Sequence, residues 1–479
     1  MPTLFTKKTV MRKQTKIVAT ISDINCEVEF IKRLYDEGMN VARLNTAHQS
    51  QDDTRRVIEN IRKVSNKIPL LLDTKGPEIR TTQVPENLEI QTGDIVYLTG
   101  NIIEHTDAPI IGVSYTDIAT EIPVGARILI DDGDIELIVT AIDSEKLTCE
   151  AQNSGKIKSK KSINIPGVVL NLPALSPKDI DYIDFAIEND IDFIAHSFVR
   201  CKEDVIEIQN ILDKRNSKIK IIAKIENQQG VDNLYEILDH VYGVMVARGD
   251  LGIEIPAEKI PIIQKNIIKA CNCARKPVIV ATQMLHSMIQ KPRPTRAEVT
   301  DVANAIYIGA DALMLSGETT FGKYPVEAVQ TMAKIAVEVE VNKKNVVKLM
   351  KSTTNLVSAF LCKAAVEASE QLPIKAIIAD SHTGRTVREL AAYRSKNPIY
   401  AICYNEHVMR ELALTYGVYA DYMPKPDSTD EFIRAALNSL ITQYQFNEDE
   451  LILIIAGNFD RDKNASFIDI CTVRKRLDA

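Results

Sequence analysis

The chain has 479 residues, of which 45% are hydrophobic and 26% are charged, and its formal net charge is −7 with a pI near 5.7. This length exceeds what one hydrophobic core usually fills, so several domains are expected. No apolar run approaches the ~20 residues that span a bilayer, and the acidic balance disfavours a broad nucleic-acid surface. We expect no membrane and no nucleic-acid partner, and any anion site must be local.

The N-terminal segment and the cysteines favour a cytoplasmic location. Basic residues near the start are not followed by an apolar stretch, so the segment does not resemble a secretory signal. The eight cysteines are scattered, and the closest pair, Cys271 and Cys273, fits neither a zinc knuckle nor a thioredoxin motif. Reduced thiols are the expectation for such a pattern.

Short β-branched apolar runs alternate with amphipathic helical patterns in the first long region. This alternation is typical of a parallel sheet covered by helices. Eight such runs are present, and eight strands close a (β/α)8 barrel of the TIM type. The predicted strands are residues 16–21, 41–45, 69–74, 193–199, 220–226, 243–250, 277–284 and 312–318.

Two further domains are predicted from changes in this pattern. Residues 82–166 contain short apolar stretches with turn signals, which indicate a small β-barrel domain inserted after the third strand, where it could act as a lid. Near Ser352 the pattern restarts with strands at 376–380, 398–403 and 451–456 between helices. The predicted division is a catalytic barrel of residues 1–81 and 167–345, an inserted lid of residues 82–166, and a C-terminal α/β domain of residues 346–479 for effector binding or oligomerisation.

Polar and charged residues follow nearly every predicted barrel strand. Barrel enzymes place their chemistry at the C-terminal ends of the strands. Strands often end in polar loops without a function, but charge repeated at so many strand ends favours an active site. These residues are Arg43, Asn45, Asp73, Lys75, Ser197, Lys224, Glu226, Asp250, Thr282, Ser316 and Glu318.

Glu226 and Asp250 end adjacent predicted strands, which are ~4.8 Å apart, so both could hold one divalent cation. Magnesium suits two carboxylates because it leaves positions for substrate oxygens. Lys224 precedes Glu226 by two residues and would share its side of the barrel, which places a cation where phosphoryl transfer needs one. Two unrelated surface acids, or a Lys224–Glu226 salt bridge without catalytic function, remain alternatives.

An anion site is predicted beside this cation site. Arg43 has a forked guanidinium suited to a phosphate or carboxylate, and Asn45 supplies a neutral oxygen. Charged and polar groups are also dense just before the inserted domain, at Asp73, Thr74, Lys75, Glu78 and Arg80. Residues 317–324 have the spacing of a phosphate-binding P-loop, but Tyr324 stands where a Ser or Thr should meet magnesium, so we disfavour that interpretation.

Several segments resemble the signature segments of the pyruvate kinase family, in that family's order. They are MNVARLN, LDTKGPEIRT, KIEN, MVARGDLGIEIP, VIVATQML, KPRPTRAE, DVANAI and LMLSGET, and they cover the barrel almost completely. The resemblance implies transfer of the phosphoryl group of phosphoenolpyruvate to ADP, giving pyruvate and ATP in glycolysis. It also implies Mg²⁺ or Mn²⁺ as cofactor, K⁺ as a further cation, and a homotetramer.

The resemblance also implies individual functions. Lys224 would stabilise the transition state, and Glu226 with Asp250 would bind magnesium. Ser316 and Glu318 would join a proton relay to the enolate. Substrate contacts would come from Arg43, Lys224, Gly249, Asp250 and Thr282, and of these Arg43, Lys224 and Thr282 are also catalytic candidates. Nucleotide contacts would come from Asn45, Arg80 and Lys161. The Asp131-Asp132-Gly133 turn would supply an acid of the lid.

The family's potassium site is only partly matched. In the family the ion is held by Asn45, a serine two residues on, Asp73 and the carbonyl of Thr74, but this chain has Ala47 in place of the serine. Glu78 is the acidic variant associated with monovalent-cation dependence. We expect a K⁺ site completed by water, because losing one neutral ligand weakens a site less than losing its carboxylate.

A loop in the C-terminal domain resembles the family's effector loop. It lies between a predicted strand and a helix, where hydroxyls, a glycine and an arginine can bind a phosphate. Ordinary helix capping is the alternative, and the later stretch GNFDRDKNASF departs from the family pattern. The predicted ligands of a phosphorylated allosteric effector are Ser381, Thr383, Gly384, Arg385 and Thr386.

Two other functions fit part of the pattern. A pyruvate- or phosphoenolpyruvate-dependent lyase also binds an enolate through magnesium on a barrel, but the inserted domain with Lys161 argues against it. An inactive metabolite-binding relative would not be expected to keep Arg43, Lys224, Glu226 and Asp250 together.

Overall fold

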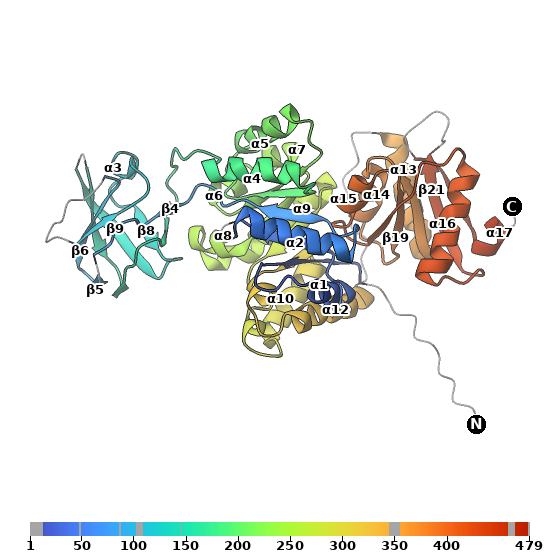
Figure 1. The fold of residues 1–479 in the computed structure, drawn as a ribbon, viewed down its shortest axis with the longest axis horizontal. Helices are drawn as coiled ribbons and strands as arrows, with labels where there is room; N and C mark the ends of the chain where they lie inside the picture. The colour runs from blue at the N-terminus through green and yellow to red at the C-terminus, as the bar shows by residue number, and fades with distance from the viewer. Residues whose placement is uncertain are drawn as a thin grey trace, which may run out of the picture.

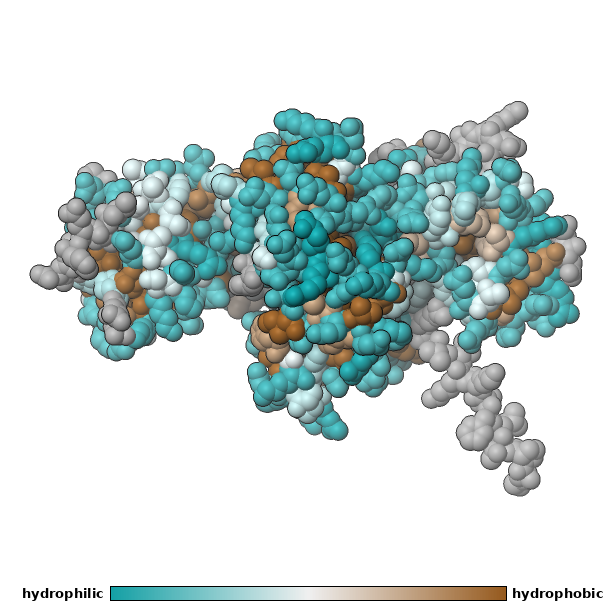
Figure 2. Space-filling view, viewed as in Figure 1, coloured by the Kyte–Doolittle hydropathy of each residue, from teal (hydrophilic) through white to brown (hydrophobic). Residues whose placement is uncertain are grey.

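A central barrel lies between an inserted β-sheet and a C-terminal α/β domain (Figure 1). This computed structural model describes residues 13–46, 49–85, 88–101, 109–143, 145–343, 355–457 and 465–477. Within those ranges no helix combines the length and the apolar character needed to cross a membrane. The visible face is mostly hydrophilic, with apolar residues gathered over the barrel (Figure 2).

Eight parallel strands close the barrel in the order β1-β17-β16-β15-β14-β13-β3-β2. Each strand therefore pairs with its sequence neighbour except where β1 meets β17 and closes the ring, and where β3 meets β13 across the insertion. The predicted TIM barrel is confirmed. Its strands are β1 (Lys16–Thr20), β2 (Val41–Asn45), β3 (Leu70–Asp73), β13 (Phe193–His196), β14 (Lys220–Ile225), β15 (Gly243–Ala247), β16 (Val278–Ala281) and β17 (Ala312–Leu315).

Apolar side chains fill both the inside of the barrel and the layer between its strands and helices. The inner cluster includes Val18, Phe193 and Met245, and Leu414 of the C-terminal domain joins it at the N-terminal end of the barrel. Continuous apolar strands such as β16 suit this burial on both faces. The surrounding helices are α1 (Val28–Asp36), α2 (Gln51–Val64), α4 (Pro177–Glu188), α5 (Lys202–Lys214), α6 (Gln228–Asp232), α7 (Leu234–His240), α8 (Arg248–Glu254), α9 (Ile260–Ala274), α10 (Arg296–Tyr307), α11 (Gly317–Thr320) and α12 (Pro325–Asn342).

Four predicted strands run three residues too far at their C-terminal ends, because β13 ends at His196, β15 at Ala247, β16 at Ala281 and β17 at Leu315. The prediction that residues 248–250 continue the sixth strand is wrong, because β15 ends at Ala247 and Asp250 lies in the first turn of α8. Ala247 pairs with Ala281, the last residue of β16, so no partner strand remains beyond it. Likewise β17 ends at Leu315, and Glu318 lies in the short helix α11.

The inserted segment forms a sheet of seven strands in the order β4-β12-β8-β9-β10-β6-β7. Its edges meet, because an isolated bridge joins Thr81 to Val113 and the Ser114 amide donates to the Arg80 carbonyl at 2.8 Å. The sheet thus curls around its own apolar core. Its elements are β4 (Ile79–Arg80), β6 (Ile95–Thr99), β7 (Ile110–Gly112), α3 (Ile118–Glu121), β8 (Arg127–Ile130), β9 (Ile135–Ile142), β10 (Leu147–Ala151) and β12 (Ser162–Asn164), with a separate pair of β5 (Glu89–Ile90) and β11 (Gly155–Lys156).

The C-terminal domain contains a five-stranded sheet in the order β20-β19-β18-β21-β22. Only β22 is antiparallel, and separate apolar clusters cover the two faces. This arrangement confirms the predicted α/β class. The elements are α13 (Leu356–Gln371), β18 (Ile374–Ser381), α14 (Arg385–Ala392), β19 (Ile399–Cys403), α15 (Glu406–Leu412), β20 (Val418–Tyr422), α16 (Thr429–Tyr444), β21 (Leu451–Gly457), β22 (Ala465–Thr472) and α17 (Val473–Leu477).

Candidate active site

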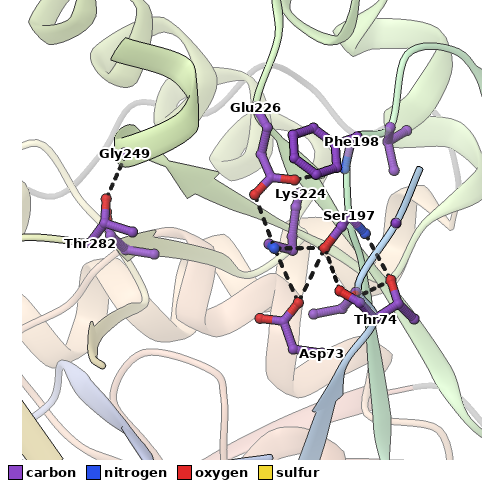
Figure 3. Close-up of polar contacts among 12 residues, drawn as sticks. Asp73, Thr74, Ser197, Phe198, Lys224, Glu226, Gly249 and Thr282 are labelled. Atoms are coloured by element: carbon purple, nitrogen blue, oxygen red, sulfur yellow. Dashed lines mark hydrogen bonds and ion pairs between the residues drawn. The ribbon is translucent and has the colours of Figure 1, made fainter. Parts of the chain in front are cut away.

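The Lys224 ammonium lies among three oxygens at the C-terminal mouth of the barrel (Figure 3). Its Nζ is 3.0 Å from Glu226 Oε1, 3.1 Å from Asp73 Oδ1 and 2.7 Å from Ser197 Oγ. Lys224 belongs to β14, and Glu226 follows the end of that strand, so the spacing of two residues does bring them together. Burial lowers the pKa of Lys224, but Asp73 and Glu226 outweigh this effect and raise it above its usual value, so the side chain stays charged.

One oxygen of Glu226 is held by a backbone hydrogen bond, and the other faces only the Lys224 charge. Oε2 accepts the Phe198 amide at 2.7 Å, whereas the buried Oε1 makes no hydrogen bond despite its closeness to Lys224. Burial raises the pKa of this carboxyl, the Lys224 charge opposes the rise, and the charge of Asp250 adds to it. A buried carboxylate oxygen without a hydrogen bond is unfavourable unless a ligand completes it, so Glu226 with Asp250 fits a divalent cation.

Asp73 is buried between two cationic side chains. The Arg43 Nε donates to its Oδ2 at 2.6 Å, and Lys224 lies beside its Oδ1. Burial opposes ionisation, but Arg43 and Lys224 prevail and hold the pKa of Asp73 below its usual range. Arg43 also donates to Thr20 Oγ1 at 3.0 Å, which fixes the guanidinium across neighbouring strands.

Thr282 follows β16 in a strained conformation. Its φ of +69° is rare for a β-branched residue, and such strain is typical of functional sites. The Gly249 amide donates to its Oγ1 at 2.8 Å, so the loop after β16 is tied to α8 (Figure 3). Arg248 donates to the Thr282 carbonyl at 2.7 Å and pairs with Asp301 at 2.6 Å, which supports the strained backbone.

Ser316 and Glu318 are joined at the end of β17. Glu318 is buried, with Oε2 accepting the Ser316 amide at 2.9 Å and Oε1 accepting the Leu285 amide at 3.1 Å. Both carboxylate oxygens therefore have backbone partners. This geometry fixes Ser316 and the loop after β16, and it gives Glu318 no free oxygen of the kind found on Glu226.

Of the three candidate nucleotide residues, Asn45 ends barrel strand β2, whereas Arg80 and Lys161 lie on or beside the inserted sheet. Lys161 Nζ is 2.8 Å from Asp131 Oδ1, and Arg80 is 2.7 Å from Glu78 Oε2. Arg80 also donates to the Lys160 carbonyl at 2.7 Å. Both cations thus have partners within the insertion and its first connection. A cavity of about 270 Å³ lies where the two connections to the insertion meet the barrel. The connections line it with residues such as Pro77 and Leu172, and the barrel lines it with residues such as Phe198 and Asn227.

The candidate potassium ligands lie next to one another on adjoining strands. Asn45 pairs in register with Asp73, and the Thr74 carbonyl accepts Ser197 Oγ at 2.7 Å. These oxygens suit a monovalent cation, although Arg43 already shares the Asp73 carboxylate. Ala47 lies outside the described residues. In the described part of the chain no group of three or more His, Cys, Asp or Glu side chains forms a metal site, so any ion needs further oxygen ligands.

The candidate effector loop lies at the start of α14. Ser381 Oγ accepts the Gly384 amide at 2.8 Å, and Gly384 has a φ of +75° as the residue before the helix. Thr383 and Arg385 are exposed beside it. This hydrogen bond shapes the turn before α14, whereas α14 itself has no side-chain cap on its first turn. Most of the divergent GNFDRDKNASF stretch, residues 458–464, lies outside the described residues.

Ser197 was given no function by the sequence reasoning. Its hydroxyl lies against Lys224, and the next residue, Phe198, holds Glu226. The available signal was only a serine near the end of a predicted strand, which is weak because such residues are common in loops. Its importance becomes visible when β13 and β14 are placed side by side.

A barrel whose mouth holds a buried ammonium between carboxylates defines an enzyme for an anionic substrate. The model for "Pyruvate kinase, barrel domain" matches residues 12–329, and that for "Pyruvate kinase, alpha/beta domain" matches residues 360–471. The chain is 48% identical to a pyruvate kinase of Borreliella burgdorferi, over 98% of this chain and 99% of that protein. It is 44% identical to a pyruvate kinase of Staphylococcus aureus strain USA300, over 93% of this chain and 78% of that protein.

The chain belongs to the pyruvate kinase family. Membership makes it a phosphotransferase that acts on phosphoenolpyruvate or pyruvate with ADP or ATP and depends on a metal ion. The resemblance drawn from the sequence segments is thereby confirmed.

Proposed function

We propose that the barrel mouth transfers the phosphoryl group of phosphoenolpyruvate to ADP through Lys224, with Mg²⁺ or Mn²⁺ held by Glu226 and Asp250. The observation that carries this assignment is the charged Lys224 beside a Glu226 oxygen that makes no hydrogen bond. The divalent cation would neutralise negative charge on the substrate oxygens. Lys224 supplies a second, fixed positive charge, which stabilises the transferred group as its charge is redistributed.

Substrate orientation is assigned to Arg43, Thr282 and Gly249. Asp73 holds Nε and Nη2 of Arg43 and Thr20 holds Nη1, so the remaining N–H groups of this fixed guanidinium can donate to a carboxylate or phosphate. Thr282 Oγ1 is directed by the Gly249 amide and itself donates to the Ala281 carbonyl at 2.6 Å. Ser316 and Glu318 are assigned to the proton relay toward the enolate, and Thr282 is assigned to substrate binding and catalysis beside them.

Nucleotide binding is assigned to Asn45, Arg80 and Lys161. Lys161 is half-buried against Asp131, so it must exchange a local ion pair for a phosphate when the insertion closes. A partly exposed ion pair of this kind contributes little stability, so exchanging it for a phosphate costs little free energy. The insertion thus acts as a lid over the barrel mouth.

A potassium site is assigned to Asn45, Asp73 and the Thr74 carbonyl, completed by water. The register pair between Asn45 and Asp73 supports this assignment. Replacement of K⁺ by tetramethylammonium is expected to reduce turnover. Unchanged turnover would show that Arg43 and Lys224 already supply all the positive charge that Asp73 requires.

Regulation and assembly are assigned to the C-terminal domain. Ser381, Thr383, Gly384, Arg385 and Thr386 would bind a phosphorylated effector at the start of α14. A homotetramer is supported by Leu356, Val357 and Phe360, which expose 69%, 66% and 71% of their surface on α13 and would be covered by a second copy. We assign the enzyme to glycolysis in the cytoplasm.

A steady-state assay of pyruvate formation from phosphoenolpyruvate tests these assignments together. ADP, Mg²⁺, K⁺ and candidate sugar phosphates are varied one at a time, after removal of metals with EDTA. We expect no pyruvate without ADP or without the divalent cation. Pyruvate formed at full rate without ADP would instead indicate a lyase.

A further inference from the structure

We propose that Ser197 is a positioning residue for Lys224, acting as the neutral third partner of its ammonium. The inference rests on the function proposed above for Lys224. Ser197 Oγ lies 2.7 Å from Lys224 Nζ, which is the shortest of the three contacts around this ammonium. The serine is 2% exposed, so water cannot readily replace the contact.

The direction of each hydrogen bond follows from the donors available. A lysine ammonium has only donors, so Ser197 Oγ accepts from Lys224 and must direct its own proton elsewhere. The Thr74 carbonyl lies 2.7 Å from this oxygen, whereas Asp73 Oδ1 lies 3.3 Å away. The hydroxyl proton therefore belongs to the Thr74 carbonyl, and a lone pair of Ser197 remains directed at Lys224.

The backbone around Ser197 is fixed from both sides. Its amide donates to Thr74 Oγ1 at 3.1 Å, and Phe198, at φ +55°, donates its amide to Glu226 Oε2 at 2.7 Å. A side chain at Gly76 would come within 2.9 Å of both Ser197 and Phe198, so the glycine permits this close packing. Two consecutive residues thus hold the ammonium and the carboxylate of the proposed catalytic pair.

A neutral partner suits a lysine that must act on a negatively charged substrate. Asp73 and Glu226 already keep the ammonium protonated, and a third carboxylate would further offset its positive charge. A substrate oxygen must replace one of the three partners. Glu226 Oε1, which makes no hydrogen bond, is the easiest to exchange, and Ser197 with Asp73 then keeps Lys224 in place.

Ser197→Ala removes the oxygen, Ser197→Cys keeps the shape with a weaker acceptor, and Thr46→Val is the matched control. Thr46 is also buried, and its Oγ1 donates to the Asp73 carbonyl at 2.8 Å, whereas Lys224 Nζ contacts the side chains of Ser197, Asp73 and Glu226. We expect S197A to lower kcat about 10-fold or more with little change in KM for phosphoenolpyruvate. S197C should be intermediate, and T46V should stay within about two-fold of the wild type.

A second measurement does not depend on turnover. Each variant, without substrates, is treated with limiting acetic anhydride, and acetylation of Lys224 is quantified by mass spectrometry. We expect S197A to raise the labelled fraction at Lys224 at least about two-fold and T46V to leave it unchanged, because Ser197 is a direct partner of the ammonium and Thr46 instead contacts the Asp73 carbonyl.

Thermal unfolding of each variant separates positioning from folding. The proposal is overturned if S197A keeps kcat within about two-fold of the wild type, or if S197A and T46V lose kcat equally in line with their stability. Lys224→Met in the same assay makes the failures distinguishable. An inactive K224M with an active S197A refutes only the positioning function, whereas an active K224M refutes the proposed function of Lys224 itself.

Discussion

Two buried lysines at opposite ends of the barrel differ in what surrounds them. Lys224, near the end of β14, meets Asp73 and Glu226, and these carboxylates raise its pKa against the effect of burial. Lys16, at the start of β1, donates to the Val418 carbonyl of the C-terminal domain, and its ammonium lies 4.6 Å from the centre of the Tyr419 ring. Burial there prevails over the charges of Glu340 and Asp311 and lowers the pKa of Lys16 to about 8. The partners, rather than burial alone, decide whether the cation persists.

Asp311 and Glu226, the acids at the two ends of the barrel, also differ in how many of their oxygens accept hydrogen bonds. Near Lys16, Asp311 accepts both Arg394 Nη atoms, at 2.9 and 2.6 Å, and also the amides of Tyr416 and Val278. At the mouth, Glu226 leaves Oε1 without a hydrogen bond. A saturated network joins the barrel to the C-terminal domain, whereas an incomplete one is ready for ligands.

Lys224→Met should break the network at the barrel mouth, formed by Lys224, Asp73 and Glu226, with the largest effect on activity. We expect kcat to fall by about 10³-fold or more, because a fixed charge that acts on the transferred group is removed. Folding should be retained, since the raised pKa of Glu226 lets this carboxyl take up a proton when the lysine is absent. Steady-state kinetics and thermal unfolding measure the two effects.

Lys220→Met is the matched control for K224M. Lys220 begins the same strand at the opposite end of the barrel, where it lies 3.7 Å from Glu411. We expect near-normal kcat for K220M. Equal losses of activity in both variants would mean that the strand, rather than the mouth, is sensitive to loss of a lysine.

Arg394→Met should break the network of Arg394 and Asp311 between the barrel and the C-terminal domain. We expect it to lower stability and to leave activity nearly unchanged. Removing one member of a buried ion pair leaves Asp311 without its cation, which costs about 3–5 kcal/mol in the free energy of unfolding. We expect kcat per folded molecule to remain within a few-fold, because Arg394 pairs with Asp311 at the end of the barrel opposite the mouth. Urea denaturation followed by circular dichroism, combined with kinetics below the transition, measures both quantities.

Arg474→Met provides the comparison for R394M. Arg474 pairs with Glu448 on the surface, with 58% and 53% of the side chains exposed. Its loss should change stability little, because exposed pairs are screened by solvent. If R394M were as harmless as R474M, the saturated network would not hold the domains together.

The barrel itself could be predicted because its information is local. Apolar runs such as residues 278–281 identify strands wherever they lie in the chain, and eight of them indicate closure. The proximity of Lys224 and Glu226 also followed from a spacing of two residues on one strand. The assignments of individual residues to substrate and metal stay predictions.

Contacts between distant segments could not be read in the same way. Asp250 was expected at a strand end but lies in α8, because the pairing of β15 with β16 ends at Ala247. Ser197 is opposite Lys224 only after β13 pairs with β14. Lys16 is an ordinary lysine in the sequence, and its burial depends on a domain that begins more than 300 residues later.

Lys16→Met tests, through the pH dependence of stability, whether Lys16 loses its proton at the end of the barrel that contacts the C-terminal domain. In the unfolded chain the Lys16 ammonium titrates near 10.5, whereas in the folded chain its pKa is about 8. Below pH 8 both states bind the proton and folding bears the full cost of burying the charge. Between pH 8 and 10.5 only the unfolded state keeps the proton, so the wild type gains stability relative to K16M as the pH rises, by up to about 3 kcal/mol.

The difference between wild type and K16M in the free energy of unfolding is measured from pH 7 to 10.5. Lys334→Met, at an exposed position on α12, serves as the control and should give a difference that does not change with pH. A flat difference for K16M as well would mean that Lys16 keeps its proton when folded, as Lys224 does. The two lysines would then differ in their partners but not in their charge, because the Val418 carbonyl and the Tyr419 ring would suffice to hold a buried ammonium.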